Sequence, residues 1–99
     1  MSSTYRYRFT DRVPAEEVEV TLLLALIGAE ALHGAAQARL DAAHAFDGNA
    51  RTVTIDAGSA VGIDLNKLFA GYLAREFGDD AFRIERLNQQ PQPREPVTA

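Results

Sequence analysis

Apolar and polar residues follow two different periods along this chain. Residues 5–10, 51–56 and 82–87 alternate with period two, which is typical of half-buried strands. Residues 14–33 and 60–77 repeat apolar side chains at three- and four-residue intervals, which predicts two amphipathic helices. The pattern therefore predicts the order strand, helix, strand, helix, strand.

The segment between the first helix and the second strand, residues 35–46, allows two interpretations. Its many alanines, with Gln37, Arg39 and Leu40, favour a helix by propensity. The Asp47-Gly48-Asn49 turn ahead of residues 51–56 favours a strand instead, because such a turn closes a hairpin. We favour the strand and keep the helix as the alternative.

With a strand at residues 35–46, the element order becomes β-α-β-β-α-β. This order resembles the ferredoxin-like arrangement, in which two helices cover one face of a four-stranded antiparallel sheet. The predicted fold is therefore α+β, a ferredoxin-like βαββαβ two-layer sandwich. Residues 1–87 would form this single domain, and the Gln-, Pro- and charge-rich residues 88–99 would form a disordered or extended polar tail.

Composition narrows the classes of function. The chain has 99 residues, 46% of them hydrophobic, with no cysteine and a net charge of −4. The missing thiols exclude disulfides and cysteine chemistry, and the acidic balance without a lysine-rich strip argues against a nucleic-acid partner. The most apolar stretch, residues 18–31, contains two glutamates and is shorter than the ~20 residues of a membrane span. With no export-signal pattern in residues 1–10, we expect a cytoplasmic protein without a membrane partner.

The first helix carries apolar residues on two opposite sides. At 100° per residue, one stripe faces the expected core, and its members are Val18, Leu22, Ala25, Ala29 and Leu32. The opposite stripe comprises Val20, Leu23, Leu24, Ile27 and Ala31. A helix on a sheet needs only one such stripe, and contiguous exposed apolar patches usually mark an interface. The second stripe is therefore the predicted interface, unless another part of this chain covers it.

A second candidate lies on the face of the sheet away from the helices. If the aromatic residues of segment 5–10 point to the core, Arg6 and Arg8 point outward, and Arg83 joins them from a neighbouring strand. Three arginines can bind a carboxylate or a phosphate. The alternative is a solvated face on which acids such as Glu85 neutralise the arginines.

Other candidate chemistry is weak, and we predict no catalytic residues, metal or cofactor. Asp41, His44 and Asp47 have ligand-like spacing on a helix, but in a strand His44 points away from both acids. The segment Gly58–Gly62 lies where anions bind some α/β proteins, yet it lacks the lysine of a phosphate loop. Ser59 as a helix N-cap explains it more simply.

These observations favour a non-catalytic interaction module. The second stripe of the first helix would join a homo-oligomer, or a subunit of an assembly with another protein. The alternative is a small domain that binds or senses an anionic ligand through the outward arginines.

Overall fold

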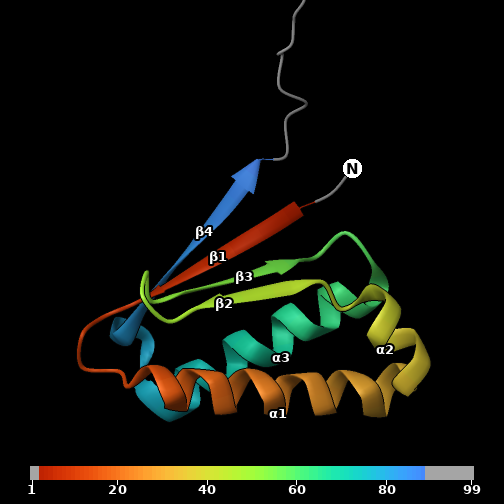
Figure 1. Ribbon diagram of the computed structural model, residues 1–99, viewed down its shortest axis with the longest axis horizontal. Coiled ribbons are helices and arrows are strands. Elements are labelled where there is room, and N and C mark those ends of the chain that lie inside the picture. The colour runs from red at the N-terminus through yellow and green to blue at the C-terminus, as the bar shows by residue number, and fades with distance from the viewer. Residues whose placement is uncertain (1–2, 89–99) are drawn as a thin grey trace, which may run out of the picture.

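The computed structural model describes residues 3–88 (Figure 1). Four strands, three α-helices and one short 3-10 helix follow one another along these residues. Their order is β1 (Ser3–Phe9), α1 (Ala15–His33), α2 (Ala35–Asp41), β2 (His44–Asp47), β3 (Thr52–Asp56), α3 (Ala60–Phe77), η1 (Asp79–Ala81) and β4 (Phe82–Asn88). The tail predicted for residues 88–99 lies outside the described residues, except that Asn88 ends β4.

The four strands form one antiparallel sheet in the order β2-β3-β1-β4. β1 is central, as expected, with Arg6 opposite Thr54 of β3 and Glu85 of β4. The long helices α1 and α3 lie together on one face of the sheet (Figure 1). The chain is thus a mixed α+β fold with an open antiparallel sheet. Within residues 3–88, no helix is long and apolar enough to span a membrane.

The strand predicted for residues 35–46 is wrong over most of its length. Residues 35–41 form α2, and only the last part of the segment joins the sheet, as β2. Gly34 breaks the first helix with φ 89°, and its carbonyl accepts a bond from the Ala38 amide at 3.0 Å. Because the following alanines satisfy their backbone groups locally, helix propensity prevails until Ala42.

The core contains an aromatic cluster between the sheet and α3. Tyr7 is fully buried and meets Phe69 edge to face, with ring centroids 4.8 Å apart. Phe9 and Phe82 complete the cluster. The Tyr7 hydroxyl donates to Asn66 Oδ1 at 2.6 Å, which satisfies the polar end of a buried ring. Burial raises the pKa of Tyr7 well above its ordinary value, and the nearby Tyr5 adds to the rise.

Candidate functional site

The second apolar stripe of α1 points away from the sheet and is exposed. Its large members are Val20, Leu23, Leu24 and Ile27, each 53–60% exposed, and Ala31 is exposed beside them. We call these five residues the outer face of α1. Within residues 3–88 no other segment covers them. The opposite stripe packs on the sheet, so α1 is apolar on a buried side and on an exposed side.

One residue of the core-facing stripe is not where the sequence predicts it. Leu32 is 64% exposed, whereas Thr21 is buried on the same side of the helix. In its last turn α1 presents His33 to α3, where His33 Nε2 lies 2.8 Å from Asp64 Oδ2. This polar contact joins the end of α1 to the start of α3 and leaves Leu32 in solvent.

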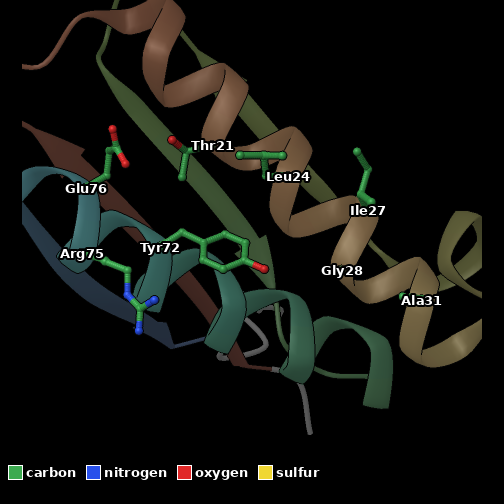
Figure 2. Close-up of a pocket in the computed structure, with 8 residues that line it drawn as sticks. All are labelled: Thr21, Leu24, Ile27, Gly28, Ala31, Tyr72, Arg75 and Glu76. Atoms are coloured by element: carbon green, nitrogen blue, oxygen red, sulfur yellow. The ribbon is translucent and has the colours of Figure 1, made fainter.

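A groove follows the boundary between α1 and α3 beside the outer face. Its main part has a volume of about 380 Å³ and is lined by residues of both helices. Figure 2 shows Tyr72 reaching from α3 toward α1, with Leu24 and Gly28 contributed by α1. Arg75 and Glu76 line the groove from α3 and supply its charged groups. The groove and the outer face share Leu24, Ile27 and Ala31, so they form one continuous surface.

Gly28 allows the two helices to approach closely at the base of this groove. A Cβ atom on Gly28 would lie 2.9 Å from Cδ1 of Leu68, which is tighter than normal van der Waals contact. The groove continues toward the start of α1, where Glu17 and Val20 face Phe77 across a volume of about 200 Å³. The apolar surface therefore extends along most of α1.

Three groove residues on α3 were not anticipated from the sequence. Tyr72 fits the helical stripe that predicts core residues, yet it is 36% exposed. Arg75 and Glu76 gave no signal because a charged pair near a helix end is usually solvated. A tyrosine at the margin of a buried stripe is the one clue available, since its ring is apolar and its hydroxyl prefers water.

The open face of the sheet brings the predicted arginines together. Arg8 lies directly opposite Arg83, and Arg6 lies opposite Glu85. The Glu85 carboxylate contacts both of the β1 arginines, at 3.6 Å from Arg6 Nη1 and 3.3 Å from Arg8 Nε. Arg83 has no ion pair or hydrogen bond within the described part of the chain. Glu85 therefore offsets the charges of Arg6 and Arg8, and Arg83 is left without an acidic partner among the described residues.

A shallow pocket of about 290 Å³ lies at the end of this arginine cluster, between β1 and β4. Arg8, Thr10 and Arg83 line it, together with Asp80, which pairs with Arg12 at 3.0 Å. The pocket thus combines two cations with a neighbouring acid.

The weaker candidates have structural explanations. Ser59 caps α3, because its hydroxyl accepts from the Gly62 amide at 2.9 Å. His44 lies exposed on β2, with Nδ1 2.7 Å from the Ala42 carbonyl oxygen. Among residues 3–88 no group of three acidic or histidine side chains is placed to hold a metal ion.

Comparison with protein-family models, with curated proteins and with solved structures finds no match. The choice between the outer face of α1 and the arginine cluster therefore depends on the geometry of this chain alone.

Proposed function

We propose that this chain is a non-catalytic interaction domain that self-associates through the outer face of α1. The observation that carries the proposal is the continuous exposed stripe formed by Val20, Leu23, Leu24 and Ile27, each more than half exposed. Apolar side chains this close together on one helix are a common mark of a protein interface.

The energy available suits a reversible dimer. Fully burying a Val, Leu or Ile side chain is worth ~1.5–3 kcal/mol, so covering the exposed half of four such side chains is worth roughly 3–7 kcal/mol per copy. A symmetric pair gains about twice that, against an association cost of about 4–15 kcal/mol. We expect a dissociation constant in the micromolar range or weaker. This corresponds to a binding free energy of about −8 kcal/mol or smaller in magnitude.

The spacing of the stripe favours a second copy of this chain as the occupant. In an antiparallel two-fold pair of α1 helices, Val20 meets the partner's Ala31 and Leu24 meets the partner's Ile27. Val20, Leu24 and Ile27 thus each meet an apolar side chain of the partner on both sides of the axis, and Leu23 lies opposite the partner's Gly28. The antiparallel direction also keeps Glu16 away from the partner's Glu16.

Sedimentation velocity over a wide range of concentrations tests this proposal. The wild-type mass should rise with concentration, and Leu23→Glu and Ile27→Glu should each weaken the association by placing a charge in the interface. Leu40→Glu is the matched control, because Leu40 is 78% exposed on α2 and lies outside the outer face. Circular dichroism verifies the fold of each variant. Unchanged association in both α1 variants would overturn the proposal.

A second candidate function is binding of a small anion by the arginine cluster. The observation that favours it is the position of Arg83 directly opposite Arg8. Like charges across a strand pair are destabilising unless each is neutralised, and Glu85 contacts Arg8 but not Arg83. A carboxylate or phosphate in the pocket between them would do so. Inorganic phosphate should then raise the melting temperature of the wild type, and Arg83→Gln should abolish the shift. Arg39→Gln on α2 is the control, and a wild type that does not respond would exclude this function.

We also infer that the fold is a ferredoxin-like domain with α2 as an extra helix. The strand order supports this, because β3 lies between β1 and β2, and β1 lies between β3 and β4. Each long helix would then connect two strands that flank a third one, which is the split βαβ arrangement. The cytoplasmic location that the sequence analysis expects is part of the same proposal.

A further inference from the structure

Among residues 3–88, β4 has a neighbouring strand on one side only, and its other edge is a second candidate surface. β4 pairs with β1 and forms one border of the sheet. The Thr10 amide donates to the Ala81 carbonyl at 3.0 Å, so Ala81 directs its backbone toward β1. Because successive strand residues direct their backbone groups to opposite sides, Phe82, Ile84 and Arg86 direct their N–H and C=O groups outward. Such an edge is a template for another strand.

The side chains along this edge are only partly covered. Ile84 is 44% exposed, although Tyr7, its neighbour across the strand pair, is fully buried. Arg83 and Glu85 lie on the open face of the sheet, on either side of Ile84. Because the two charges on either side of Ile84 are opposite, an antiparallel copy of this segment places a negative charge opposite Arg83 and a positive charge opposite Glu85.

We propose that β4 pairs with β4 of a second copy, antiparallel and centred on Ile84, so that the two sheets become one. In this register Ile84 meets the partner's Ile84 at the two-fold axis. Arg83 meets the partner's Glu85, and the same pair repeats on the other side of the axis. The outward backbone groups of Ile84 exchange two hydrogen bonds with their symmetry mates.

Among the registers centred on residues 83–85, only the one centred on Ile84 matches both the charges and the faces. A pairing centred on Glu85 would bring Glu85 against its own copy, and a pairing centred on Arg83 would bring two arginines together. Like charges directly opposite one another are destabilising. A slip by one residue would turn the side chains of the two strands to opposite faces. The order Arg83-Ile84-Glu85 therefore specifies the pairing.

α3 is the long helix nearest to this edge. α1 lies on the β2 side, where Leu26 shares a pocket with His44, and α3 lies under β1, where Asn66 bonds Tyr7. The flank of α3 turned away from α1 carries Ile63, Lys67, Ala70 and Ala74. This flank would face the second copy beneath the joined strands.

This surface is independent of the outer face of α1. Ile84 lies on the sheet and the outer face lies on the helix layer, so the two surfaces can act in the same molecule. Two different two-fold contacts per chain give a closed tetramer when the axes cross at right angles, and a larger closed assembly or an open chain otherwise.

Site-specific cross-linking tests the proposed register, because the chain has no cysteine of its own. Ile84→Cys would be made together with Leu23→Glu, which disables the α1 surface. At the axis the two Cα atoms would be ~5.5 Å apart, within the range that a disulfide spans. Arg83→Cys in the same background is the control, because its two copies would be about 8 Å apart, beyond that range.

We expect the Ile84→Cys variant to form a disulfide-linked dimer about tenfold faster than the Arg83→Cys variant, since a preformed pair raises the effective concentration of the thiols. Non-reducing electrophoresis measures the rates, and circular dichroism verifies the folds. Equal rates, or a faster Arg83→Cys variant, would overturn the register. The pair of variants is repeated without Leu23→Glu, so that a folding defect of that substitution leaves the comparison intact. Failure of the α1 proposal would leave this result unchanged.

Discussion

Gly62 shows how one residue can fix the packing of a helix on a strand. It is buried in the first turn of α3, and a Cβ atom there would overlap the Asp56 carbonyl oxygen at the end of β3. Because the obstacle is backbone, no side-chain rotation relieves it. The close approach between β3 and α3 therefore requires glycine at this position.

Gly62→Ala should lower the free energy of unfolding by about 2–4 kcal/mol, because the chain must shift to admit the methyl group. Gly71→Ala is the matched control in the same helix, since no atom lies within 4 Å of its added Cβ. That variant should be more stable than wild type by up to about 1 kcal/mol, from helix propensity alone. Urea denaturation measures both, and similar effects of the two substitutions would contradict the explanation.

Tyr7 should make the stability of the protein depend on alkaline pH. Burial raises the pKa of its phenol in the folded state, whereas in the unfolded chain the phenol ionises near its ordinary value of about 10. The folded state therefore retains a proton that the unfolded state loses. Stability is unaffected by this group below about pH 10 and should fall above it, by up to about 1.4 kcal/mol per pH unit.

Denaturation of Tyr7→Phe at neutral and alkaline pH isolates this contribution. The variant should lose about 1 kcal/mol at neutral pH with the hydrogen bond to Asn66, and its stability should fall less steeply above pH ~10. Tyr72→Phe removes an exposed phenol and serves as the control. A Tyr7→Phe variant with the alkaline slope of the wild type would argue against the buried phenol as the cause.

At the scale of elements, Gly34 separates two helices that the sequence alone could have joined. Its φ of 89° and ψ of 151° lie in a region that is essentially restricted to glycine, distinct from the left-handed helical region that asparagine tolerates. Its amide still bonds Glu30 O at 2.7 Å, which closes α1, and its carbonyl begins α2. The chain thereby changes direction within one residue.

Both Gly34→Ala and Gly34→Asn should lower the free energy of unfolding by about 1–3 kcal/mol, because neither side chain relieves this conformation. No atom lies within 4 Å of a Cβ at Gly34, so the effect is one of the backbone alone. Thermal denaturation of the two variants measures it. An asparagine variant as stable as wild type would indicate a left-handed helical cap instead.

At the scale of the whole molecule, the two proposed contacts should respond differently to salt. The β4 contact includes two exposed pairs of Arg83 with the partner's Glu85, and the Debye length falls from about 10 Å at ~0.1 M salt to about 3 Å at ~1 M. Dimerisation of Leu23→Glu, which retains this contact, should therefore weaken roughly fivefold in high salt. Dimerisation of Ile84→Lys, which retains the outer face of α1, should change little, because that contact is apolar.

Sedimentation equilibrium at the two salt concentrations distinguishes these cases. Leu23→Glu combined with Ile84→Lys should be monomeric in both conditions. Equal salt dependence in the two single variants would mean that the contacts are not the separate surfaces described above.

Local patterns in the sequence were sufficient for the elements and for part of the candidate site. Periodic patterns depend on side chains a few residues apart, so they can be recognised without knowledge of the fold. Examples are the alternation at residues 82–87 and the apolar stripes of residues 14–33 and 60–77. The outer face of α1 was visible for the same reason. Residues 35–46 could not be assigned this way, because alanine-rich helix propensity and a hairpin turn favoured different structures.

Only the tertiary structure decided which of these surfaces is covered. The sequence determined that α1 has two apolar sides, but packing on the sheet buried one and left Val20 and Ile27 in solvent. The tertiary structure also placed Tyr72 beside α1 rather than in the core. It made β4 an edge strand of the sheet and left Ile84 exposed. Such outcomes depend on segments that are far apart in the chain and become neighbours only when it folds, and periodicity along the sequence carries no information about them.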